Sequence, residues 1–215
     1  MDGWHRATQD TGLWPSPALG ILELPDALEM ASSDRAATTR RLMADIAADR
    51  DLAAMLRETR AAWQDRCLIH GDVRRENVLT AQSRCDTTVK VVDWELSGSG
   101  DPAWDLAGVL AEVTLDSVRQ HREPHRTWSP AHRDVVKTFV RTYGTRGGLV
   151  GDDAPAFWHH VVSCAVGRVL HVACEWAEGQ VSGEPGPQLS LLSAARGLLQ
   201  RRSRLTTTLI RWAEA

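Results

Sequence analysis

The chain has 215 residues, of which 43% are hydrophobic and 25% charged, and its formal net charge is −3. This length suits one domain or two small ones, and it supports a core that needs neither disulfides nor a structural metal. The net charge excludes the general basic surface of a nucleic-acid-binding protein, so we expect no nucleic-acid partner. We find neither a secretory signal nor an apolar run long enough to span a bilayer, so we expect no membrane partner either.

The cysteines and the basic residues give further information about the type of protein. The four cysteines form no CxxC motif, and without an export signal they predict free thiols and a cytoplasmic location. Only two of the 25 basic residues are lysines, Lys90 and Lys137, which leaves 23 arginines. A basic stripe near the end of the chain is typical of a solvated helix face and consists of Arg196, Arg201, Arg202, Arg204 and Arg211.

The first third of the chain changes from irregular to helical. Glycines and prolines are frequent in residues 1–20, which we expect to form an irregular lead-in. Residues 22–24 predict a short extended piece. Residues 27–65 contain neither proline nor glycine and carry apolar residues at helical spacing, so they predict helices, with Ser33 or Asp34 as an N-cap.

The remainder of the chain begins with strands and continues with helices. Short runs of β-forming residues, separated by polar segments, predict strands over 67–69, 78–80 and 89–92. The later segments predict helices near 102–119, 130–143, 154–178 and 187–213. The expected fold class is therefore α+β and mostly α, with one domain over residues 21–215 that contains a small β-hairpin.

The predicted hairpin brings polar side chains together. If residues 78–80 and 89–92 pair as antiparallel strands, Asp93 arrives beside Asn77. Asp72 precedes Asn77 by five residues, so we expect the three side chains to converge. Carboxylate and amide oxygens suit Mg²⁺, and Asp72 can accept a proton from an attacking hydroxyl. Kinase-type sites for phosphoryl transfer use this combination of groups.

Three motifs resemble those of the aminoglycoside-phosphotransferase-like kinases. Residues 70–77 contain His-Gly-Asp, four further residues and Asn, similar to the catalytic loop of that family. Residues 93–95, Asp-Trp-Glu, are similar to its metal-binding segment, and residues 100–107, Gly-Asp-Pro-Ala-Trp-Asp-Leu-Ala, to the motif that opens the next helix. The resemblance extends over residues 20–210 and implies the C-terminal lobe of a kinase-like fold.

The resemblance also implies roles for individual residues. Asp72 would be the general base, and Asn77 and Asp93 would hold Mg²⁺. Arg74 would neutralise charge on the transferring phosphoryl group, although a surface arginine is an equal alternative. Glu95 would reach a second metal ion or the acceptor.

Two further residues are expected to support the catalytic loop. His70 would brace the loop itself, and Asp105 would support it from the following helix. Asp101 and Pro102 have a structural explanation of their own, because aspartate is a good N-cap and proline suits the first helical position.

The sequence lacks the motifs of the lobe that clamps the nucleotide in kinase-like enzymes. A complete kinase-like enzyme carries, upstream of its catalytic loop, a glycine-rich loop and a strand lysine that contact the phosphates. Both lysines here follow His70, and no such glycine motif follows a strand. We therefore expect the N-terminal lobe to be absent, with three explanations: a protein partner completes the site, the sequence starts late, or the protein is a non-catalytic remnant.

The expected activity is transfer of the γ-phosphate of ATP (or GTP) to a hydroxyl, with Mg²⁺. The resemblance implies acceptors such as aminoglycosides, other small alcohols, or Ser/Thr of a peptide. The sequence is also similar to the phosphotransferases of lanthipeptide biosynthesis. In such a system a lyase partner could complete the enzyme. The alternative is a pseudokinase that binds a peptide or partner without turnover.

Histidines and cysteines recur along the predicted helix 154–178 without predicting a zinc site. The pair His160/Cys164 lies about 10 Å along the helix axis from the pair His171/Cys174. Ligands at about 2.0–2.3 Å cannot span that separation to one ion. We interpret these residues as part of a packing face.

Overall fold

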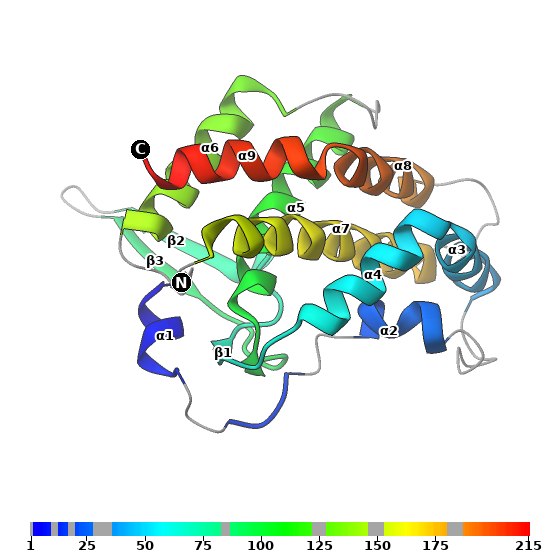
Figure 1. Ribbon diagram of the computed structural model, residues 1–215, viewed down its shortest axis with the longest axis horizontal. Helices are drawn as coiled ribbons and strands as arrows, with labels where there is room; N and C mark the ends of the chain where they lie inside the picture. The colour runs from blue at the N-terminus through cyan, green and yellow to red at the C-terminus, as the bar shows by residue number, and fades with distance from the viewer. Residues whose placement is uncertain are drawn as a thin grey trace.

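Helices dominate the computed structural model of the chain, and two small antiparallel sheets lie at one side of them (Figure 1). The structure describes residues 2–9, 13–16, 20–27, 36–82, 87–121, 128–145, 153–179 and 187–215.

Helix α7, Ala154–Glu178, is the centre of the fold (Figure 1). It packs against α5 (Pro102–His121), α8 (Pro187–Gln200) and α9 (Arg202–Ala213). Every residue from Val161 to Leu170 is buried, so the middle of α7 is covered on all sides. Burial of this largely apolar segment favours the packing of the surrounding helices against α7.

Five further α-helices of the described residues complete the helical part of the fold. Helices α2, α3 and α4 contact one another and α7, α1 contacts the first strand, and α6 contacts α5 and α9. Their bounds are α1 Asp2–Ala7, α2 Gly20–Ala27, α3 Ala37–Ala48, α4 Arg50–Ala62 and α6 Pro130–Thr145. Within the described part of the chain, no helix combines the length and apolar character needed to cross a membrane.

The two sheets flank the loop that contains the His-Gly-Asp motif. Strand β1, Cys67–Ile69, pairs antiparallel with β4, Gly98–Gly100. Strands β2, Val78–Gln82, and β3, Thr87–Val91, form the expected hairpin, with Val78 opposite Val91. The predicted strands and the antiparallel pairing of the hairpin are confirmed. The three helices predicted near 102–119, 130–143 and 154–178 are confirmed within their described residues.

Two expectations for the N-terminal part are wrong. Residues 1–20 are not uniformly irregular, because Asp2–Ala7 form α1 and Ser16 donates a backbone hydrogen bond to the Ser99 carbonyl oxygen (2.9 Å). Leu22 and Leu24 belong to α2 instead of an extended piece, because helical geometry buries both side chains where α2 meets α4 and α7. The N-cap expected at Ser33 or Asp34 lies outside the described residues.

The last predicted helix is two helices. Arg201 separates α8 from α9, and its backbone (φ −99°, ψ 6°) leaves the helical region. The break lets α9 pack against α6 and α7 while α8 packs against α5 and α7. The hydrophobic pattern alone does not show this break.

A close approach fixes α5 beneath the loop after β1. A Cβ atom added to Gly108 of α5 would collide with the Val73 carbonyl oxygen and lie 3.0 Å from the Val73 Cβ. Only glycine at this position lets the loop backbone lie directly on the helix.

We therefore predict that Gly108→Ala lowers the free energy of unfolding by about 1–3 kcal/mol through overpacking. Urea unfolding followed by circular dichroism measures the change. Gly20→Ala is the matched control, because an added Cβ there meets nothing within 4 Å. Equal unfolding midpoints for the two variants would contradict the close approach.

Candidate active site

A buried carboxylate holds the start of the catalytic-loop motif in place. Asp105, in the first turn of α5, is fully buried. Its Oδ2 accepts a hydrogen bond from the backbone N–H of His70 (2.8 Å), and its Oδ1 accepts one from Gly71 (3.0 Å). Backbone donors on both oxygens fix the loop relative to α5.

The same carboxylate is also held by the N-terminal helix. His5 of α1 is fully buried, and its Nε2 lies 3.1 Å from Asp105 Oδ2. The other ring nitrogen of His5 lies 3.4 Å from the hydroxyl of Tyr143 in α6. Helix α1 is therefore part of the support beneath the loop. Sequence reasoning missed His5, because it lies in the segment expected to be irregular and is 65 residues away from the motif it supports.

Gly71 is required by the shape of the loop. Its φ of 81° is in the left-handed region, and an added Cβ would collide with the Leu96 carbonyl oxygen. The Gly71 carbonyl oxygen accepts hydrogen bonds from the indole N–H of Trp104 (2.8 Å) and from Arg168 (3.0 Å). The loop is thus held by both α5 and α7.

His70 connects this loop to the segment before Asp93. Its buried ring places Nε2 2.9 Å from the Val92 carbonyl oxygen. The ring also meets Trp94 edge to face, with centroids 4.7 Å apart. These contacts link the two motifs through one side chain.

Asp72 lies at the centre of a network of charged and polar contacts. Its Oδ1 lies 3.1 Å from Arg168 Nη2, and its Oδ2 lies 2.7 Å from Arg74 Nε. The amide Nδ2 of Asn77 donates to the Asp72 backbone oxygen (3.0 Å) and to Oδ2 (3.1 Å). The Asp72 side chain is 10% exposed, so a narrow part of it remains accessible.

The charge of Asp72 is stabilised by its partners. Burial disfavours the ionised form, but the adjacent guanidinium groups of Arg74 and Arg168 outweigh it and hold the pKa of this carboxyl below its usual range. Asp72 is therefore an ionised, weakly basic carboxylate at neutral pH, and its partners fix the orientation of its side chain.

Arg168 was not found by sequence reasoning. It projects from the buried middle of α7, donates to the Val73 carbonyl oxygen (3.1 Å), and places its guanidinium 5.4 Å from the centroid of the Trp104 ring. An arginine within an apolar helical run could have indicated it, because a buried cation requires a partner of opposite charge or a hydrogen-bond acceptor.

Arg74 bridges the loop to α7. Besides Asp72, it contacts Glu175, with Nη2 3.2 Å from Oε1, and Glu175 in turn lies 3.2 Å from His171 Nε2. The Arg74 side chain is 27% exposed. It is therefore a partly buried member of an ion-pair network.

Asn77 and Asp93 are brought together as predicted. The Val92 N–H donates to the Asn77 carbonyl oxygen (2.9 Å), so Asp93 follows immediately at the end of the hairpin. Asp93 is exposed and has a φ of 66°, a left-handed conformation that is rare for a residue with a side chain. Such a conformation is concentrated at functional sites.

The donor set at this position fits Mg²⁺. Asn77 uses Nδ2 toward Asp72, which leaves Oδ1 for a cation, and Asp93 adds an exposed carboxylate. Among the described residues, no group of three or more His, Cys, Asp or Glu side chains is arranged to hold a metal ion. Two protein oxygens suit Mg²⁺ that takes its remaining ligands from phosphates and water, and do not suit an ion enclosed by protein.

Glu95 is not brought into this group. It lies in an exposed turn, and no hydrogen bond or ion pair joins it to the other candidate residues in the described part of the chain. Its role at a second metal ion or at the acceptor remains a prediction.

The N-cap assigned to Asp101 is confirmed, and the structure adds a partner. Asp101 Oδ1 accepts from the Ala103 N–H (2.9 Å), and Oδ2 lies 3.1 Å from His160 Nε2. His160 also lies 3.7 Å from the Cys164 sulfur, whereas His171 pairs with Glu175. The histidines and cysteines of α7 therefore serve separate contacts.

Comparison with known proteins agrees with this geometry. A family model described as the phosphotransferase enzyme family matches residues 4–147. This span is more than half of the chain and includes His5 of α1, the loop, the hairpin and Asp105. The chain therefore belongs to the phosphotransferase enzyme family, which confirms the resemblance at that level. No curated protein and no solved structure matches the chain.

The ion pairs of Glu175 predict a loss of stability in acid. His171, and then Arg74, stabilise the carboxylate more than burial opposes it, and lower the pKa of Glu175 to about 2. The stabilisation is complete above the ordinary pKa of about 4.3 and is lost as the pH falls through the interval down to about 2.

We therefore expect the stability advantage of wild type over Glu175→Gln to shrink as the pH falls from about 5 toward about 2. Urea unfolding of both proteins at several pH values measures the difference. The exposed Glu214→Gln variant is the control and should track wild type at every pH. A constant gap between wild type and Glu175→Gln would contradict the assignment.

Proposed function

We propose that the chain transfers the γ-phosphate of ATP (or GTP) to an alcohol hydroxyl, with Mg²⁺ held by Asn77 and Asp93. The observation that carries the proposal is the placement of Asp72. Its carboxylate is charged and is fixed by Arg74, Arg168 and the side-chain amide of Asn77.

Asp72 would act on the acceptor hydroxyl. A carboxylate has about four lone-pair positions, so the contacts already made leave room for one more donor. The acceptor oxygen forms a bond to the γ-phosphorus, the bond from that phosphorus to the β–γ bridging oxygen breaks, and the hydroxyl proton passes to Asp72. A lowered pKa suits this step, because phosphoryl transfer depends more on orientation of the nucleophile than on a strong base.

Arg74 would act on the transferring group. Its guanidinium remains charged at every working pH, and its contacts with Asp72 and Glu175 hold it at the edge of the site. A planar donor of this kind can neutralise the charge that develops on the equatorial phosphoryl oxygens. Bound Mg²⁺ would supply further neutralisation of the phosphates.

The loop support makes the positioning of these groups possible. Asp105 accepts a hydrogen bond from the backbone of the loop, and the His70 ring contacts the Val92 carbonyl oxygen. Neither of these contacts involves the carboxylate of Asp72. We assign both as positioning residues. Small displacements of a catalytic group cost large factors in rate, so their contribution is expected in turnover more than in substrate binding.

A second component that clamps the nucleotide would fit against the hairpin. The side chains of β2 and β3 are exposed on both faces of the sheet, with Leu79 53% and Val89 59% exposed. An isolated two-stranded hairpin is marginally stable in water, so apolar side chains at this position favour a covering partner. That partner would be another chain, such as a peptide-modifying lyase, or a further segment of the same polypeptide. The acceptor would then be a small alcohol or Ser/Thr of a precursor peptide.

We predict that Asp72→Asn lowers the rate of phosphoryl transfer by about 10²–10⁴-fold, because the amide cannot take the hydroxyl proton. ATP consumption with Mg²⁺ over a panel of alcohol acceptors is the measurement. Asp134→Asn, an exposed aspartate on α6, is the matched control and should retain wild-type activity. Undiminished turnover in Asp72→Asn would overturn the assignment of the base.

The proposed partner at the hairpin leads to a separate prediction about turnover. We expect turnover to rise when the chain is combined with the product of a neighbouring gene that clamps nucleotide. Leu79→Asp should remove this increase by at least about tenfold, because it places a charge in the apolar contact. Lys137→Asp, on α6, is the control. Turnover that never appears in any pairing would instead favour the pseudokinase alternative.

A further inference from the structure

Residues 13–16, which we call the edge segment, lie along β4. Pro15 forms a parallel bridge with Ser99. The Ser99 N–H donates to the Trp14 carbonyl oxygen (2.6 Å), and the Ser16 N–H donates to the Ser99 carbonyl oxygen (2.9 Å). The edge segment therefore extends the sheet of β1 and β4 by a short third piece.

The contact between the edge segment and β4 is close. A Cβ atom added to Gly98 of β4 would lie 2.7 Å from the Trp14 carbonyl oxygen and 2.7 Å from the Ser16 nitrogen. On the catalytic loop, a Cβ atom added to Gly71 would lie 3.1 Å from Ser16 Oγ. The edge segment thus lies against both the strand that follows Asp93 and the loop that contains the proposed base.

Two side chains of the edge segment bind the turn after Asp93. The Ser16 hydroxyl donates to the Leu96 carbonyl oxygen (2.8 Å), and the Trp14 indole N–H donates to the Ser97 carbonyl oxygen (3.0 Å). Ser16 is 5% exposed, so water competes little for its bond, whereas Trp14 is 65% exposed. Both bonds therefore act on the third and fourth residues after Asp93.

The turn itself is closed by hydrogen bonds of its own. The N–H and the hydroxyl of Ser97 both donate to the Trp94 carbonyl oxygen (3.1 and 2.6 Å), and the Trp94 indole N–H donates to the Val91 carbonyl oxygen (3.0 Å). Because the turn is closed in this way, contacts at its far end restrict the backbone of Asp93 as well.

Asp93 is held on its other side by the hairpin and the catalytic loop. The Val92 N–H donates to the Asn77 carbonyl oxygen, and the His70 ring contacts the Val92 carbonyl oxygen. Between the two held ends, Asp93 has a φ of 66°. This conformation persists only where the surrounding structure determines it, so release of one end would let the backbone relax and move the carboxylate.

We propose that Trp14 and Ser16 are positioning residues for the carboxylate of Asp93. They act through the backbone of the turn, and Asp93 itself supplies the ligand. The inference rests on the proposed function, in which Asn77 and Asp93 hold Mg²⁺. Since only two protein oxygens are offered to that ion, the fixed position of each contributes strongly to its affinity.

The test uses Mn²⁺ in place of Mg²⁺, because carboxylate and carbonyl oxygens suit both ions. The full chain is titrated without nucleotide, and electron paramagnetic resonance measures the free Mn²⁺. Asp93→Asn defines the part of the binding that belongs to this carboxylate. Ser16→Ala and Trp14→Phe, which remove the two donors, should each raise the Kd of that part at least about threefold.

The Mg²⁺ dependence of turnover separates positioning from a general loss of structure. In Ser16→Ala and Trp14→Phe, the Mg²⁺ concentration for half-maximal phosphoryl transfer should rise by a similar factor. Saturating Mg²⁺ should restore most of the rate. A purely structural defect would instead lower the rate at every Mg²⁺ concentration.

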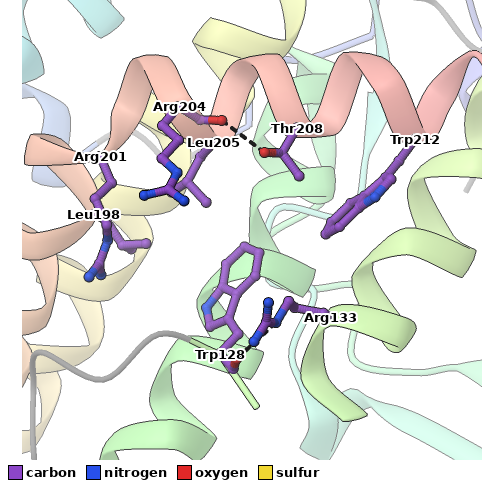
Figure 2. Close-up of a pocket in the computed structure, with 8 residues that line it drawn as sticks. All are labelled: Trp128, Arg133, Leu198, Arg201, Arg204, Leu205, Thr208 and Trp212. Carbon is purple, nitrogen blue, oxygen red and sulfur yellow. Dashed lines mark hydrogen bonds between the residues drawn. The ribbon is translucent and has the colours of Figure 1, made fainter. Parts of the chain in front are cut away.

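A cavity outside the candidate site provides the matched control. It lies between α9, the end of α8 and the start of α6, and Arg201 and Arg204 of the basic stripe line it, so the stripe is not a uniformly solvated face (Figure 2). In its wall, the Trp128 indole N–H donates to Thr114 Oγ1 (3.1 Å), a bond similar in length to that of Trp14. Trp128→Phe removes this donor and should leave the Kd of Mn²⁺ unchanged.

The outcomes distinguish this inference from the proposed function. Circular dichroism melting curves verify that each variant is folded, and if Ser16→Ala does not fold, the exposed Trp14 decides. A wild-type Kd for Mn²⁺ in either folded variant, or an equal rise in Trp128→Phe, would overturn the positioning role and leave the metal site intact. Mn²⁺ binding that Asp93→Asn does not reduce would overturn the metal site, and the positioning role with it.

Discussion

The buried carboxylate of Asp105 is the interaction on which the candidate site depends. A charge removed from water is tolerated only when hydrogen bonds replace its hydration. Here the replacements are the backbone amides of His70 and Gly71 and the ring of His5. Asp105 belongs to α5 and its partners to α1 and the loop after β1. One group thus fixes three segments that are distant in the sequence.

The second constraint comes from α7. Its apolar middle must be buried, and this carries Arg168 into the interior, where Asp72 and two loop carbonyl oxygens pair with it. The same helix presents Glu175 to Arg74 about two turns further along. The arrangement keeps Asp72 charged and oriented at the cost of basicity, which suits a reaction that depends on orientation.

Local patterns predicted much of the fold. The hairpin followed from two short β-forming runs with a polar connection, and their pairing placed Asp93 beside Asn77. The helix over 154–178 was found at its observed bounds, because apolar spacing is a local signal. Helix α1 and the break at Arg201 were missed. Both depend on which surface the segment packs against, and such surfaces form only when distant elements meet.

The sequence by itself indicated the family. The order and spacing of His70, Asp72, Asn77 and Asp93 resemble the motifs of phosphotransferases, and the family match confirms the resemblance at that level. The tertiary structure alone decided which groups hold Asp72, that a helix near the N-terminus supports the loop, and that part of the basic stripe lines a pocket. Those contacts join residues far apart in the chain, and no local periodicity encodes which distant side chain will satisfy a buried charge.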